Sequence, residues 1–310
     1  MLIQEVDMSF DDLPDLPRPI VPAGRAWVER ISAAARDALA SHPCTTDIPY
    51  GHESYWQKLD IFFPRQAAAR LPVFCFLHGG AWFTGCKEWL AGMAPSITAA
   101  PALFVAASHR RVPDNRFPDP IDDIIDLIAW LYRHVGDFGG DPDNIQIGGH
   151  SAGAHLAALA TLRTDLLLSH GLPADVIKAC HPVSGIFDLR AQLPHSLGDT
   201  HSREGRHIVD WLLPTRDLAS AASPIEQIAG QTPPPFHVVW GGSDLPDLEA
   251  QSLAFIATLQ AAGGQIVSAR FADHDHFMMS EACADPSGSW VRQVHSWLRD
   301  AGPAGIRESV

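Results

Sequence analysis

Apolar residues along the chain follow two alternating patterns. Short apolar runs have the length and residue types of strands buried on both faces; they lie at 72–77, 102–108, 144–148, 179–184, 236–240 and 265–271. Helices are predicted between and after them, at 87–98, 121–134, 154–160, 248–262 and 290–298. Strands that alternate with helices predict a mostly parallel sheet with helices on both faces, which is an α/β fold.

Two segments interrupt this alternation. Residues 1–24 are rich in Asp and Pro and are predicted to form an irregular arm, followed by an amphipathic helix at 25–39 and strands at 45–50 and 57–63. Residues 189–222 carry three histidines and scattered charges, with a short helix expected around 208–213. No linker divides the chain, so we predict a single domain over 1–310, with 1–45 as N-terminal arm and helix and 189–222 as a small lid insertion.

Composition and charge narrow the function classes. A net charge of −14 argues against binding to nucleic acid or to an anionic membrane surface. The five cysteines are scattered without paired spacing, no apolar run approaches a membrane span, and no signal peptide is recognisable at the N-terminus. We therefore expect a cytoplasmic protein with no nucleic-acid or membrane partner, although the charge does not specify a substrate; a homodimer stays open.

The strongest chemical signal is Gly149-His150-Ser151-Ala152-Gly153. It follows a short apolar strand and precedes an alanine-rich helix, the setting that a G-x-S-x-G nucleophile elbow requires. Small residues on both sides of the serine permit a tight turn, and the helix start offers free N–H groups. Ser151 is therefore the candidate nucleophile.

Candidate partners for Ser151 follow other strands. The carboxyl ends of parallel strands meet at one sheet edge, so Asp244 and His276 are expected near Ser151, in the order Ser, Asp, His. Histidine is the base that can activate a serine near neutral pH, and a carboxylate fixes the histidine tautomer. Asp247 competes with Asp244, and His274 competes with His276; the shorter distance after the strand favours Asp244, and the position ahead of a helix favours His276.

A Gly-Gly turn offers donors for an oxyanion. Gly79 and Gly80 follow the strand at 72–77, so their backbone N–H groups, with that of Ala152, are predicted to form the oxyanion hole. His78 is expected to support this loop by hydrogen bonding. Side chains proposed for the substrate pocket are Trp82, Phe83, His150, Phe187 and Trp211. His201, His207 and Asp210 would be the candidates for a metal site, but no metal-binding spacing occurs, so we expect no metal.

Together these motifs resemble the α/β-hydrolases of the hormone-sensitive-lipase-like esterases and, more closely, of the kynurenine formamidase (arylformamidase) branch. The resemblance rests on the run 78–82 (HGGAW), on 138–142 (FGGDP) followed by 149–153, on 184–189 and on 59–64, and it spans roughly residues 45–300. It implies an α/β-hydrolase fold, Ser151, Asp244 and His276 as the triad, and no cofactor. Ala81, where esterases more often carry a third glycine, and the segment 189–222 depart from the pattern.

The sequence thus predicts a serine hydrolase of a small carboxylic ester or an aryl formamide. A general short-chain carboxylesterase, a lactonase or a carbamate-cleaving enzyme would use the same groups, because the pocket decides the substrate. A ligand-binding relative without activity is the alternative from a different class.

Overall fold

One sheet of eight strands organises the chain. A computed structural model describes residues 22–300 except 53, 67–69 and 193–207, together with Leu13, Leu16, Pro17 and Pro19. The strands lie in the order β1-β2-β4-β3-β5-β6-β7-β8. Their bounds are β1 Cys44–Pro49, β2 Lys58–Phe62, β3 Leu71–Leu77, β4 Leu103–Ala107, β5 Gly140–His150, β6 Ile177–Val183, β7 Phe236–Ser243 and β8 Ile266–Asp275. Pairs β1–β2 and β2–β4 are antiparallel and all the others are parallel.

Helices fill the connections between the strands. The α-helices are α1 Pro22–Ser41, α2 Ala94–Ile97, α3 Asp119–His134, α4 Ala152–Leu162, α5 Thr164–Ser169, α6 Leu189–Gln192, α7 Ile208–Leu212, α8 Leu248–Ala261, α9 His276–Ala282 and α10 Ser289–Asp300. The 3-10 helices are η1 Lys87–Met93, η2 Val135–Phe138, η3 Arg216–Ala219 and η4 Pro224–Gln227. Among the described residues, no helix has the length and apolarity that a membrane span requires.

Side chains alternate across the sheet and create two cores. Val73, Cys75 and Leu77 of β3 pack on the side of α3, α4 and α8, whereas Phe74 and Phe76 pack on the side of α1, η1 and α10. This is the period of two that a pleated strand imposes, and both faces are apolar because helices cover both. The predicted mostly parallel sheet with helices on both faces is confirmed.

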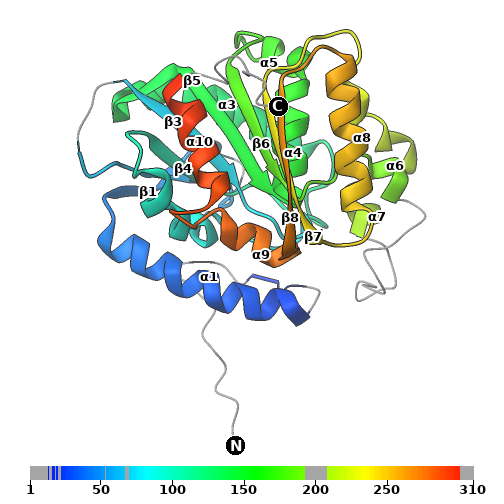
Figure 1. The fold of residues 1–310 in the computed structure, drawn as a ribbon. Coiled ribbons are helices and arrows are strands. Elements are labelled where there is room, and N and C mark those ends of the chain that lie inside the picture. The colour runs from blue at the N-terminus through cyan, green and yellow to red at the C-terminus, as the bar shows by residue number, and fades with distance from the viewer. Residues whose placement is uncertain are drawn as a thin grey trace, which may run out of the picture.

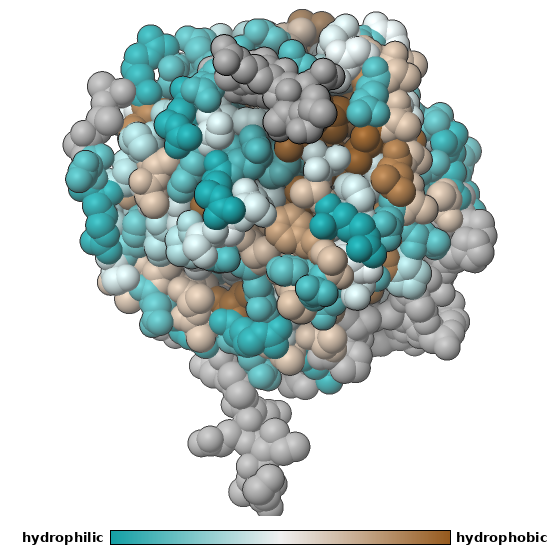
Figure 2. Space-filling model, in the orientation of Figure 1, coloured by the Kyte–Doolittle hydropathy of each residue, from teal (hydrophilic) through white to brown (hydrophobic). Residues whose placement is uncertain are grey.

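Helix α1 crosses the end of the sheet where the parallel strands finish. Figure 1 shows it along the bottom of the molecule, beside α9 and below the ends of β7 and β8. The N-terminal helix therefore covers the edge at which functional groups collect in such sheets. In the same orientation, the face seen in Figure 2 is mostly hydrophilic, with hydrophobic residues in small groups.

Two local predictions need correction, and a third is tested only in part. The segment 87–98 is not one helix: η1 is a 3-10 helix, and the short α2 follows it. Strand β8 continues to Asp275, so His274 lies in a strand and not in a loop. The expected short helix near 208–213 is α7, but residues 193–207 of the predicted lid lie outside the described residues.

The loop before α3 holds α7 in place. The Arg116 guanidinium donates to the carbonyls of Asp210, Trp211 and Leu213, and the N–H of Phe117 donates to the carbonyl of Leu212. Orphan carbonyls at the end of a helix need such donors, and a cation is favourable there. The described part of the predicted lid is thus attached to the main body.

Candidate active site

Ser151 lies on a sharp turn between β5 and α4. Its φ of 56° and ψ of −117° place a non-glycine residue in a strained conformation, which is typical of functional turns. The flanking glycines are required by space: a Cβ on Gly149 would lie 2.4 Å from the carbonyl carbon of Gly153, and one on Gly153 would lie 2.3 Å from the Leu77 oxygen. This is the geometry of a nucleophile elbow.

The structure brings the three predicted triad residues together. His276 Nε2 lies 2.9 Å from Ser151 Oγ, and His276 Nδ1 lies 2.6 Å from Asp244 Oδ1. His276 is the first residue of α9, whose start is fixed by Asp275, because the Asp275 carboxylate accepts from the N–H groups of Phe277 and Met278. Ser151, His276 and the Asp244 side chain are buried, so their interactions are poorly screened by water.

The Asp244 carboxylate is held by several donors. Oδ2 accepts from Ser184 Oγ at 2.5 Å and from the N–H of Gly241 at 3.0 Å, and Oδ1 accepts from the N–H of Leu245 at 2.8 Å. Burial raises the pKa of Asp244, but the hydrogen bonds and charge of His276, with Ser184 and Gly241, outweigh it and hold the pKa well below its usual range. The sequence assigned Ser184 no role, although it begins the run 184–189. In the structure its φ of 50°, directly after β6, marks it as a residue of a strained turn.

The turn after β3 lies against the serine. A Cβ on Gly79 would lie 3.3 Å from Ser151 Cβ, and Gly80 has a φ of +118° that few L-residues adopt. Among the described residues, the N–H groups of Gly79, Gly80 and Ala81 donate to no backbone carbonyl. The N–H of Ala152, the first residue of α4, has no intrahelical acceptor. These donors flank Ser151, as an oxyanion hole requires.

Two buried side chains support this turn. His78 Nδ1 donates to the carbonyl of Gly79 at 2.8 Å, and its ring stacks on His109 at 4.6 Å. Trp82 donates from its indole to His155 Nδ1 at 3.2 Å, and His155 Nε2 donates to the carbonyl of Ala222. Burial and the nearby His109 lower the pKa of His78, so its ring is neutral and suited to a hydrogen-bonding role.

The rings predicted for the substrate pocket are in different surroundings. Phe83 and Trp211 are half-buried, with ring centroids 5.0 Å apart, where the turn after β3 meets α7. Phe187 is fully buried and stacks on Phe255 at 4.1 Å, so it packs within the core, as Trp82 does beneath the turn. His150 contacts the His276 ring at 4.6 Å.

The competing candidates lie elsewhere. Asp247 is exposed at the start of α8, and the His274 ring packs on Phe271 at 5.3 Å. Asp210 pairs with Arg216 at 3.0 Å, whereas His201 and His207 lie outside the described residues. Of the candidates that the structure describes, Asp244 and His276 are the ones connected to Ser151.

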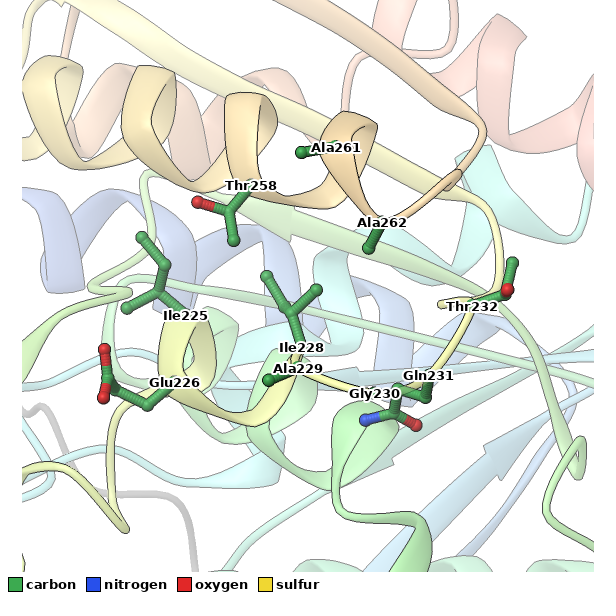
Figure 3. Close-up of a pocket in the computed structure, with 10 residues that line it drawn as sticks. All are labelled: Ile225, Glu226, Ile228, Ala229, Gly230, Gln231, Thr232, Thr258, Ala261 and Ala262. Carbon is green, nitrogen blue, oxygen red and sulfur yellow. The ribbon is translucent and has the colours of Figure 1, made fainter.

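One hollow in the described part of the chain is remote from this chemistry. It has a volume of about 620 Å³ and lies between residues 225–232, which begin in η4, and the C-terminal end of α8, where Figure 3 shows Thr258, Ala261 and Ala262. The lining residues up to Thr232 precede the start of β7 in the chain, whereas Asp244 follows the end of that strand. This hollow is therefore at the opposite edge of the sheet from Ser151.

Comparison with known proteins identifies the family of this chain. The BD-FAE family model matches residues 59–259, which is more than half of the chain. The chain belongs to the BD-FAE family. Esterase LipQ of Mycobacterium tuberculosis is 34% identical over 235 residues, covering 72% of this chain and 54% of LipQ. The chain thus spans about half the length of the first curated relatives that it matches.

Other relatives of this BD-FAE chain cover more of its length. A kynurenine formamidase of Danio rerio is 25% identical and covers 84% of both chains. The crystal structure of esterase B from Lactobacillus rhamnosis has a TM-score of 0.70 at 19% identity, covering 91% of this chain and 96% of its own. An esterase of Pyrobaculum calidifontis has a TM-score of 0.68 at 20% identity, covering 88% of this chain and 92% of its own. At these identities the structural likeness shows the α/β-hydrolase fold alone.

Proposed function

We propose that this chain hydrolyses small carboxylic esters through an acyl-enzyme on Ser151. The observation that carries the proposal is the continuous hydrogen-bonded path from Ser151 Oγ to His276, at 2.9 Å, and on to Asp244, at 2.6 Å. Esterase names among the relatives agree with it. A ligand-binding relative without activity has no need to retain this path.

In acylation, Ser151 Oγ attacks the ester carbonyl carbon while His276 Nε2 accepts the hydroxyl proton. The imidazolium that forms is stabilised by the Asp244 carboxylate. Negative charge on the carbonyl oxygen is met by N–H groups of Gly79, Gly80 and Ala152; losing one such donor typically costs about 3 kcal/mol of transition-state stabilisation. The C–O bond then breaks, and the alcohol leaves with the proton from His276.

Deacylation repeats these steps with water. His276 removes a proton from the water molecule, whose oxygen attacks the acyl carbon. The second tetrahedral intermediate collapses, the acid is released, and Ser151 Oγ recovers its proton from His276. No redox partner or cofactor is needed, because bonds and protons balance at each step.

An aryl formamide is the second candidate substrate. The observation that favours it is the formamidase relative, which covers 84% of both chains, whereas the chain covers 54% of LipQ. The same groups would cleave the amide, with His276 protonating the leaving amine.

Two measurements test the proposal. Fluorophosphonate labelling followed by peptide mass spectrometry should modify Ser151 in the wild type, and Ser151→Ala should abolish turnover of p-nitrophenyl acetate while thermal unfolding stays unchanged. Retained turnover in Ser151→Ala would rule out the mechanism. The ratio of kcat/KM for N-formylkynurenine and p-nitrophenyl acetate then separates the two substrate classes.

A further inference from the structure

A second hollow lies beside the nucleophile, under the N-terminal helix. We call it the α1 cavity; its volume is about 230 Å³, and its lining includes Trp27, Arg30, His78, Trp89, His150 and Glu281. Gly79 also lines it, and a Cβ added to Gly79 would lie 3.3 Å from Ser151 Cβ. The lining of the cavity thus lies directly against the candidate nucleophile.

The α1 cavity has aromatic walls. Trp27 of α1 and Trp89 of η1 meet edge to face with centroids 5.4 Å apart, and the Trp27 ring lies 6.2 Å from that of His150. Both indole rings are at most 5% exposed. A mostly apolar lining with a few polar groups is typical of sites for small molecules.

Four ring nitrogens of this lining are unpaired. The indole N–H groups of Trp27 and Trp89, His78 Nε2 and His150 Nδ1 are buried without a hydrogen-bond partner among the described residues. The Nδ1–H of His78 donates to a carbonyl, and so does the Nε2–H of His150, which leaves the other nitrogen of each ring as an acceptor. Buried polar atoms normally have partners, so these two donors and two acceptors, on residues that line one cavity, are available to a polar occupant.

An ion pair crosses the outer end of the cavity. Arg30 Nη2 of α1 lies 2.6 Å from Glu281 Oε1 of α9, and their side chains are 55% and 36% exposed. Exposed pairs contribute little to stability, so this one can open for an entering group at small cost.

We propose that the α1 cavity binds one ring-sized half of the substrate and that Trp27 and Trp89 limit its size; this rests on the proposed ester hydrolysis. A cavity of about 150 Å³ suffices for benzene, so 230 Å³ accommodates a single ring with a small polar substituent. The indole N–H groups meet an acceptor on that substituent, and the two imidazole nitrogens meet a donor.

Two ester series test this assignment. One varies the acyl group at constant leaving group (p-nitrophenyl acetate, butyrate, benzoate), and the other varies the alcohol of an acetate (ethyl, butyl, benzyl). In Trp27→Ala and Trp89→Ala, we expect the kcat/KM ratio of the ring-bearing to the smallest ester to change at least tenfold in one series. That series identifies which half occupies the cavity.

Trp290→Phe is the matched control. Trp290 is equally buried with an unpaired indole N–H, but it packs on Phe74 and Phe76 and does not line the cavity, so its ratios should stay within threefold of the wild type. If Trp27→Ala and Trp89→Ala cleave the smallest esters as the wild type does and both ratios stay within threefold, the assignment is wrong. Such a result would leave water as the occupant.

A binding measurement separates this assignment from the proposed function. Benzamide has a ring, an acceptor and a donor, and calorimetry on the full chain needs no turnover. If the wild type cleaves no ester, the proposed function fails, and the cavity assignment then depends on benzamide alone. Binding that is lost in Trp27→Ala and kept in Trp290→Phe supports it; no binding to the wild type, or equal binding to all three proteins, overturns it.

Discussion

His150 Nε2–H donates to the backbone carbonyl of His276 at 2.9 Å, although 126 residues separate the two in the sequence. The residue before the candidate nucleophile therefore holds the backbone of the candidate base. Burial, followed by the charge of His276, lowers the pKa of His150 to about 3, so its ring is neutral at pH 7. His150 is in this sense a positioning residue.

Replacing His150 should reduce kcat more than it changes KM. In His150→Ala the base loses a contact that fixes its place, and a displacement of about 1 Å can lower a rate roughly 100-fold. We expect kcat to fall about 10- to 100-fold, with partial recovery in His150→Gln, whose amide can donate to the same carbonyl. Steady-state kinetics on p-nitrophenyl acetate measures this, and a wild-type kcat in His150→Ala would contradict it.

The two neighbouring acids should behave very differently. Asp244→Asn keeps the shape of the side chain but favours the wrong tautomer of His276, and a change of this kind typically lowers kcat about 10⁴-fold. Asp247→Asn is the matched control, since Asp247 is exposed at the start of α8, and its kcat should stay within about threefold of the wild type. Equal losses in the two variants would refute the assignment of the acid.

The Asp244 carboxylate should also make stability depend on pH. Its pKa is depressed in the folded state, so its contribution is present above the unfolded pKa of about 3.9 and is lost as pH falls through the folded value. The difference in unfolding free energy between wild type and Asp244→Asn should therefore shrink by about 1 kcal/mol from pH 7 to pH 3. Urea titrations at both pH values measure it; a difference that grows on acidification would show that the sign is wrong.

The elbow glycine Gly153 should tolerate no side chain. A Cβ there would lie 2.3 Å from the Leu77 oxygen and 2.5 Å from the His78 oxygen, so α4 would have to move away from β3. We expect Gly153→Ala to lose roughly 2–3 kcal/mol of stability, as overpacked sites do. Gly136→Ala meets nothing within 4 Å and should change stability by less than about 1 kcal/mol. Thermal unfolding of both variants tests the comparison.

Much of the fold could be predicted because its signals are local. The apolar runs that became β3, β4 and β6 differ from the predicted ranges by at most a few residues, since strands buried on both faces are apolar throughout. The proximity of Ser151, Asp244 and His276 could also be predicted, because all three follow parallel strands that end at one edge of the sheet.

Other parts of the site depend on contacts that no local pattern encodes. Ser184 reaches Asp244 only because β6 and β7 are neighbours, and Trp27 reaches His150 only because α1 folds back across the sheet. The spacing of apolar residues over 25–39 predicted a helix but not where it packs. The prediction of a lid stays untested over 193–207, with His201 and His207, because these residues are not among the described ones.

Helix α1 lies outside the segment that the family model matches, although it covers the candidate site. The family model begins at residue 59 and ends at 259, so it includes Ser151 and Asp244 but neither α1 nor His276. A chain shortened to begin at Cys44 would keep all eight strands while uncovering His150 and removing Trp27 and Arg30. Under the proposed role of the α1 cavity, relatives that keep the catalytic groups can still differ in what they accept, and exchanging the N-terminal helix between them should transfer substrate preference.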